Sequence, residues 1–88
     1  MGVNKTPQMR NFANSTSPFA IAAGWVAIDI LVDSDSPQSV VLANVAQPTE
    51  TITLKAGQSR TINCDSNGGT AMTLTWTTGA TGSFVIQR

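Results

Sequence analysis

Apolar and polar residues alternate along much of the chain after residue 18, and a period of two is typical of β-strands. The clearest stretch is residues 70–77, where Met72, Leu74 and Trp76 alternate with threonines. Clusters of Gly, Pro, Asn, Asp and Ser recur about every 8–12 positions, the spacing expected of an all-β sandwich or barrel. We therefore expect an all-β fold, a small antiparallel β-sandwich or barrel, with no helix of useful length.

Six strands are expected between the turn-forming clusters. In chain order they are residues 20–32 with a break or bulge at Gly24, 38–46, 50–55, 59–64, 70–77 and 83–87. Pro48 is expected to close the second strand, since proline cannot donate a ladder hydrogen bond. Residues 65–69 hold the strongest turn signal, because Asn-Gly accommodates positive φ. From residue 50 onward, the short turns favour an up-and-down meander.

The first eighteen residues show no steady apolar period and carry two prolines and two basic residues but no acidic one. Such a composition predicts an extended N-terminal arm at residues 1–18, followed by a β-domain at residues 19–88. The arm is either a frayed terminus or a segment that orders on a neighbouring subunit. Its expected anchors are Met9, Phe12 and Phe19.

Several of the expected strands are apolar on both faces, whereas a two-layer sandwich buries only the inner face of each sheet. Covering each further Val or Ile contributes about 1.5–3 kcal/mol, which matters in a domain this small. We therefore expect a homo-oligomer, cyclic and with a trimer as one arrangement, formed through the first or last strand. The residues expected at the contact surface of the β-domain are Trp25, Val26, Val40, Val85 and Ile86.

The balance of charges and side-chain types narrows the function classes. The chain has 5 Lys+Arg and 5 Asp+Glu, a net charge of zero and no His. A neutral chain lacks the broad positive surface with which proteins neutralise nucleic-acid phosphates, so no nucleic acid is expected as a partner. Without His, neither Ser nor Cys64 has the usual general base. We expect no enzyme activity and no cofactor.

The longest apolar stretch, residues 19–32, is shorter than the ~20 residues that a bilayer helix needs, and Asp29 interrupts it. It also fits poorly to a signal peptide, so we expect no membrane partner and synthesis in the cytoplasm. Cys64 is the only cysteine and cannot form an internal disulfide. It is expected to pack as a small apolar residue.

Two groups of residues are candidate ligand sites. Asp33 and Asp35, with Asp29 nearby, could supply oxygen ligands to Ca²⁺, but their loop lacks the Gly and Glu of an EF-hand. A solvated acidic turn is the favoured interpretation, and ion binding stays open.

Trp25 and Trp76 could stack on sugars, although Trp76 shares its face with apolar residues and is expected in the core. Threonines 73, 75 and 77, which Thr51 and Thr53 could extend on another strand, are expected to form a polar outward face.

The layout of a polar arm, a β-domain and the stretch LKAGQSRTI at residues 54–62, leading into an Asn-Gly-Gly turn, resembles a class of viral proteins. These are the small cement, decoration and minor capsid proteins of bacteriophages. The resemblance implies a compact β-domain with an extended arm, often arranged as trimers on a capsid shell, and hence a location in the virion. It assigns no role to any individual residue.

The function expected from the sequence is that of a non-enzymatic structural protein that self-associates and docks on a larger assembly such as a capsid shell. One alternative is a small carbohydrate- or surface-binding β-module, and another is an accessory subunit of a second protein. If the arm bridges subunits, deleting residues 1–16 should leave the β-domain folded but detach it from its partner.

Overall fold

The computed structural model describes residues 7–64 and 68–88, and these contain eight β-strands and one 3-10 turn. The elements are β1 (Gln8–Asn11), η1 (Phe12–Asn14), β2 (Phe19–Ile21), β3 (Ala27–Val32), β4 (Val40–Asn44), β5 (Gln47–Leu54), β6 (Ser59–Asn63), β7 (Met72–Trp76) and β8 (Gly82–Gln87). Most of the turn expected at residues 65–69 lies outside the described residues.

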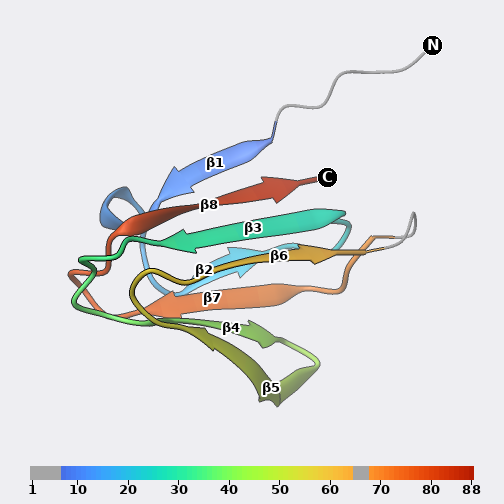
Figure 1. Ribbon diagram of the computed structural model, residues 1–88. Coiled ribbons are helices and arrows are strands. Elements are labelled where there is room, and N and C mark those ends of the chain that lie inside the picture. The colour runs from blue at the N-terminus through green and yellow to red at the C-terminus, as the bar shows by residue number, and fades with distance from the viewer. Residues whose placement is uncertain (1–6, 65–67) are drawn as a thin grey trace.

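The strands form two antiparallel sheets of four, which pack against each other as a sandwich (Figure 1). Sheet A has the strand order β1-β8-β3-β6, and sheet B has the order β2-β7-β4-β5. The predicted all-β antiparallel sandwich is confirmed. The strand pairings are nested along the sequence: β1 pairs with β8, β2 with β7, β3 with β6 and β4 with β5. This arrangement of eight strands in two sheets is a jelly roll.

The predicted meander is wrong, because only β4 and β5 are consecutive strands that pair with each other. After β5 the chain crosses between the sheets at every connection: β6 joins sheet A, β7 joins sheet B and β8 joins sheet A. The physical reason is that a short turn reverses the chain without fixing which layer the next strand enters. Crossing over lets the apolar faces of successive strands meet across one core.

The stretch expected as one strand at residues 20–32 forms two strands, β2 in sheet B and β3 in sheet A. The predicted break at Gly24 is confirmed: its φ is +102°, a backbone conformation that L side chains rarely adopt. Pro48 does not close the second strand but lies within β5. That strand is at the edge of sheet B, where a missing N–H is tolerated.

The core lies between the two sheets and is richest in aromatic rings at one end. Phe84 of β8 lies 5.2 Å from Phe12 and 5.0 Å from Phe19, measured between ring centroids. Trp76 is buried with Leu74 and the half-buried Met72 of the same strand, so the prediction that Trp76 belongs to the core is confirmed. Cys64 is half-buried and packs against this core, also as predicted.

Residues 8–14 belong to the sandwich, which corrects the expectation of an arm ending at residue 18. β1 pairs with β8, with Gln8 opposite Ile86 and Asn11 opposite Ser83. Phe12, which follows β1, is only 1% exposed. Sheet pairing satisfies the backbone of this polar stretch, so its composition does not prevent it from folding into the domain. Residues 1–6 lie outside the described part of the chain.

Candidate functional site

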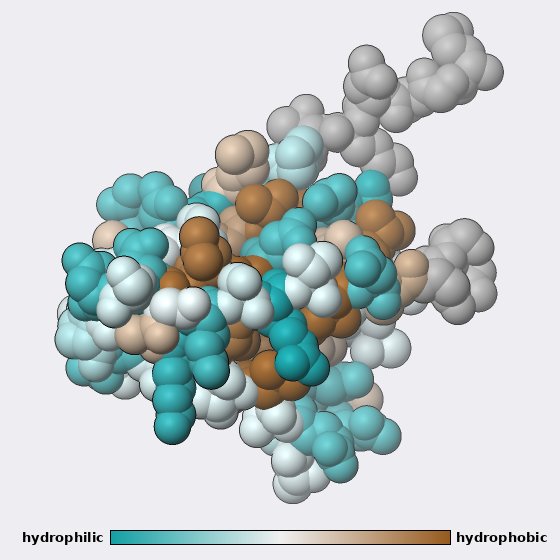
Figure 2. Space-filling view, in the orientation of Figure 1, coloured by the Kyte–Doolittle hydropathy of each residue, from teal (hydrophilic) through white to brown (hydrophobic). Residues whose placement is uncertain are grey.

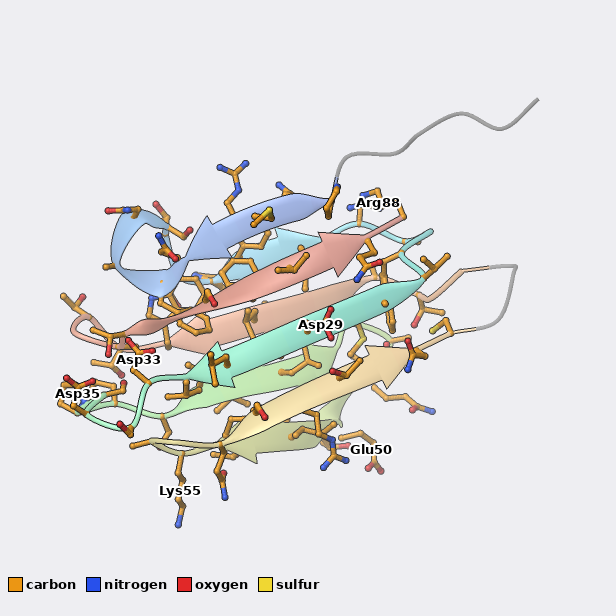
Figure 3. All side chains as sticks on the ribbon, turned by 45° about the horizontal axis from the view of Figure 1, so that its top comes forward. Asp29, Asp33, Asp35, Glu50, Lys55 and Arg88 are labelled. Carbon is orange, nitrogen blue, oxygen red and sulfur yellow. The ribbon has the colours of Figure 1, made fainter. Side chains whose placement is uncertain are left out.

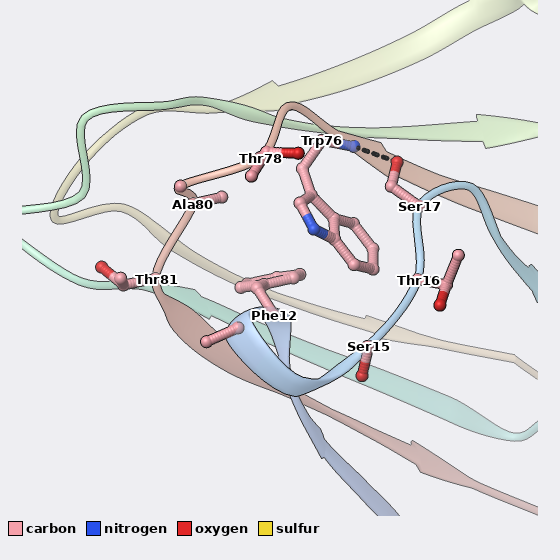
Figure 4. Close-up of a pocket in the computed structure, with 10 residues that line it drawn as sticks. Phe12, Ser15, Thr16, Ser17, Trp76, Thr78, Ala80 and Thr81 are labelled. Carbon is pink, nitrogen blue, oxygen red and sulfur yellow. Dashed lines mark hydrogen bonds between the residues drawn. The ribbon is translucent and has the colours of Figure 1, made fainter.

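A pocket of about 480 Å³ lies at one end of the sandwich (Figure 4). It is bordered on one side by η1 with the segment that follows it, and on the other by the turn between β7 and β8. Phe12, Trp76 and Ala80 supply its apolar lining, and Ser15, Thr16 and Thr78 supply hydroxyl groups. None of its lining residues is charged.

The aromatic part of this pocket is tightly packed. Phe12 and Trp76 meet edge to face, with ring centroids 4.9 Å apart and an interplanar angle of 64°. They are 1% and 8% exposed, so their ring faces are not open to a stacked ligand. The indole nitrogen of Trp76 points into the pocket (Figure 4). The pocket can therefore offer hydrogen bonds to a small neutral group, but its lining contains no side chain that exchanges a proton near neutral pH.

One rim of the pocket is fixed by Ser17. Its Oγ accepts a hydrogen bond of 2.9 Å from the backbone N–H of Trp76, which ties the segment before β2 to the end of β7 (Figure 4). On the opposite side, the Oγ1 of Thr81 is buried and has no hydrogen-bond partner among the described residues. Its hydroxyl is turned away from Trp76 (Figure 4).

The outer face of sheet A carries exposed apolar side chains among small polar ones (Figure 2). Met9, Val85 and Asp29 lie opposite one another on β1, β8 and β3, and so form one row across the sheet. Met9 is 71% exposed, and Leu31, two positions after Asp29, is 48% exposed. Such a surface is suited to contact with another protein.

Asp29 lies within this surface and is bound to neighbouring strands. Its Oδ1 accepts a hydrogen bond of 2.6 Å from Thr61 Oγ1 of β6, and its Oδ2 accepts one of 3.2 Å from Gln87 Nε2 of β8. Asp33 and Asp35 are exposed in the loop beyond β3, away from Asp29 (Figure 3). Within the described residues, no three His, Cys, Asp or Glu side chains gather where they could hold a metal ion.

The outer face of sheet B is uncharged along its central rows. Thr51 and Thr73 lie on either side of Ala43, and in the next row Thr53 and Thr75 lie on either side of Val41. The threonines of β5 therefore share a face with those of β7, as expected, but β4 separates them.

Four of the eight residues expected at contact surfaces lie in the chain's own core, so that prediction is wrong for them. They are Phe12, Trp25, Val40 and Ile86, with exposed fractions of 1%, 3%, 0% and 0%. For Trp25, Val40 and Ile86 the reason is that a stretch apolar on both faces does not indicate which face turns inward. Phe12 is buried because the pairing of β1 with β8 carries it into the core. Trp25 is further fixed by a hydrogen bond of 2.7 Å from its Nε1 to the backbone oxygen of Thr70.

The other four expected contact residues keep some exposure. Met9 is exposed, while Phe19, Val26 and Val85 are half-buried. The structure places Met9 opposite Val85 in sheet A, whereas Phe19 belongs to sheet B and packs against the core.

Sequence reasoning did not single out Leu31 and Val45, which are 48% and 56% exposed. The phase of the strand could have identified Leu31, because it alternates with the buried Ile30 and Val32. Val45 lies between β4 and β5, at the end of their hairpin.

Comparisons of the chain with protein-family models, with curated proteins and with solved structures found no match. Among the residues that the structure describes, no helix is long and apolar enough to cross a membrane. Function is therefore inferred from the chain's own fold and surfaces.

Proposed function

We propose that this chain is a non-enzymatic structural protein of a virion, which self-associates and docks on a capsid shell as a cement, decoration or minor structural protein. The observation that carries the proposal is the strand order β1-β8-β3-β6 and β2-β7-β4-β5. Eight-stranded jelly rolls are a recurring design of viral capsid domains. Since one fold hosts many functions, this support is an analogy at the level of the fold.

The surfaces of the sandwich favour protein partners. Met9 and Leu31 expose apolar surface on sheet A, and Val45 exposes it at the end of the β4–β5 hairpin. The chain is neutral overall, so copies that pack closely on a lattice would repel one another little. These features favour a second copy of the chain and a protein shell as partners over nucleic acid or membrane.

The direct test starts from virions that are purified on a gradient from cells that make the chain. These virions are probed with an antibody raised against the pure protein. We expect labelling of intact particles by immunogold microscopy and co-sedimentation of the chain with the shell. If all of the chain stays in the soluble fraction and purified particles carry no label, the proposal is wrong.

A second sedimentation experiment tests the docking face. Met9→Asp and Leu31→Asp place charges on the outer face of sheet A, and Thr75→Asp, on the exposed face of sheet B, is the matched control. We expect the first two variants to detach from particles and the control to remain bound. Equal retention of all three would exclude sheet A as the docking face.

A second candidate function, a small carbohydrate-binding module, is favoured by the pocket beside Trp76. Its uncharged lining, its hydroxyl groups and the inward indole N–H suit a neutral sugar. It ranks second because the ring faces of Phe12 and Trp76 are buried and cannot stack. Titration with neutral oligosaccharides, followed through the indole N–H resonance of Trp76, decides the matter. A saturable shift would favour the sugar module, and no shift at millimolar sugar would exclude it.

A further inference from the structure

Another pocket, of about 370 Å³, opens on one side of the sandwich between the edge strands β1 and β2. Its polar lining comes from Arg10, Asn14, Ser15 and Thr16, and Phe19 is among its apolar residues. Arg10 is the only charged residue in this lining. We call this pocket the Arg10 notch.

The register of sheet A fixes the position of Arg10. Arg10, Phe84 and Ile30 lie opposite one another on β1, β8 and β3, and Arg60 of β6 ends the same row on the other side. Phe84 and Ile30 are buried, so this row faces the inside of the sandwich. Because β1 is an edge strand, the Arg10 side chain lies at the open side between the two sheets and stays exposed.

The surroundings of Arg10 suit a carboxylate. Residues 1–28 contain no Asp or Glu. Arg60 differs, because β6 lines a pocket together with β5, and β5 carries Glu50. A guanidinium group binds a carboxylate through two N–H groups, and hydroxyl and amide groups can donate further hydrogen bonds. The Arg10 notch is therefore a candidate carboxylate site.

The complementary charge lies in the loop between β3 and β4. Asp33, Ser34 and Asp35 are consecutive exposed residues at one end of the sandwich (Figure 3). No Lys or Arg occurs in residues 11–54, so this part of the chain is acidic. The chain is neutral overall, but its charges are segregated. We call residues 33–35 the acidic loop.

The acidic loop is held in shape by the residue that follows it. Ser36 is buried, and its Oγ accepts a hydrogen bond of 3.1 Å from the backbone N–H of Thr81 and donates one of 2.8 Å to the backbone oxygen of Gln38. The backbone N–H of Asp33 donates a hydrogen bond of 3.1 Å to the backbone oxygen of Thr81. A loop fixed in this way loses little entropy when it binds.

We propose that the Arg10 notch of one copy binds the carboxylates of the acidic loop of a second copy. This inference rests on the self-association in the proposed function and names the two surfaces responsible. Charge complementarity sets the choice of partner at such a contact. The last strand, expected from the sequence to mediate assembly, has no free edge, because β8 lies between β1 and β3.

Each copy carries one notch and one acidic loop. Two copies joined reciprocally, or several copies in a ring, therefore occupy every site. Light scattering after gel filtration and sedimentation equilibrium measure the oligomeric state of the full chain. We expect a mass of at least twice 9.2 kDa for the unmodified chain.

Charge reversal on either side tests the contact. Arg10→Glu should weaken association at least about tenfold, because it places like charges together. Arg60→Glu is the matched control, since Arg60 is an exposed arginine at the other end of the same row. Circular dichroism establishes that both variants fold.

On the acidic side, a chain with both Asp33→Lys and Asp35→Lys should also associate at least about tenfold more weakly. Glu50→Lys is the control, because Glu50 is an exposed acid outside the acidic loop. It should leave association within about threefold of the original.

Mixing the two reversed chains shows whether the contact lies between copies. The Arg10→Glu chain and the Asp33→Lys, Asp35→Lys chain should each stay monomeric at a concentration at which the unmodified chain associates. An equimolar mixture should associate again, because every notch then meets a loop of opposite charge. A contact within one copy cannot produce this result.

The results separate this contact from the proposed function. A monomeric chain at high micromolar concentration overturns the contact, and so does an oligomer that either reversal leaves intact, that both controls weaken equally, or that the mixture does not restore. A monomeric chain whose Arg10→Glu variant detaches from particles would place an acidic segment of the shell in the notch, which also overturns the contact with a second copy. Absence of the chain from purified virions would overturn the proposed function, whatever the oligomeric state in solution.

Discussion

Phe12 packs edge to face against Trp76, with 4.9 Å between the ring centroids. Phe12 follows the edge strand of sheet A, and Trp76 ends β7 of sheet B. The contact therefore joins the segment that follows β1, a strand of sheet A, to β7 of sheet B. Aromatic pairs of this geometry contribute about 0.5–1.5 kcal/mol beyond the area that they bury. The segment around Phe12 is thus a structural part of the sandwich.

Phe12→Ala should lower the free energy of unfolding by about 3–5 kcal/mol, because it leaves a cavity beside Trp76 and Phe84. Urea denaturation followed by tryptophan fluorescence measures the change. Met9→Ala is the control: Met9 is 71% exposed, so its loss should change stability by less than about 0.5 kcal/mol. Equal effects of the two substitutions would contradict the placement of Phe12 in the core.

A chain that lacks residues 1–16 should lose its cooperative unfolding transition, since it has neither β1 nor Phe12. This reverses the expectation from the sequence, in which the truncated β-domain stays folded. A chain that lacks residues 1–6 is the reference, so that the difference isolates residues 7–16. Calorimetry of both chains gives the answer. Matching transitions would show that β1 contributes nothing to the domain.

Gly69→Ala should destabilise the protein by about 1–3 kcal/mol through overpacking. A Cβ atom at Gly69 would overlap the indole ring of Trp25, which cannot retreat because it is buried and bonded to the backbone of Thr70. Thermal melts measure the loss, and Thr70→Ala, at an exposed neighbouring position, is the control. In a Trp25→Ala background the cost of Gly69→Ala should largely disappear. An unchanged cost there would mean that the overlap is not its cause.

Ser17→Ala should cost about 1–2 kcal/mol, because the backbone N–H of Trp76 loses its acceptor. The specific readout is hydrogen exchange: the Trp76 amide should exchange faster, while the amides of β3 keep their rates. Ser15→Ala removes a hydroxyl from the same pocket without touching that bond. If the Trp76 amide exchanges equally fast in both variants, the Ser17 bond does not protect it.

The positions of the later strands could be predicted from the sequence, because side-chain alternation depends only on local geometry. Residues 70–77, for example, contain β7 with Met72, Leu74 and Trp76 on its inner side. The pairing of strands could not be predicted in this way. Whether β6 pairs with β5 or crosses to β3 depends on how two layers close over one core, and a turn sequence carries no such information.

The surfaces were harder to predict than the strands. In the run Val40-Val41-Leu42 every side chain is apolar, and only the layer opposite decides that Val40 and Leu42 turn inward. Phe12 is a lone aromatic in a polar stretch, and its burial follows from the register of β1 with β8. The pocket likewise depends on the bond between Ser17 and Trp76, 59 positions apart in the chain.

The nested pairing of the jelly roll also sets an order for folding. β4 and β5 are joined by a short hairpin, whereas Gln8 of β1 must meet Ile86 of β8. Contacts between distant parts of a chain form late, because loop closure costs more entropy before any contact compensates for it. During synthesis, β1 cannot pair until β8 has been made. Sheet A is therefore completed only after β8 has been synthesised, and its outer face, with the row formed by Met9, Val85 and Asp29, cannot form before then.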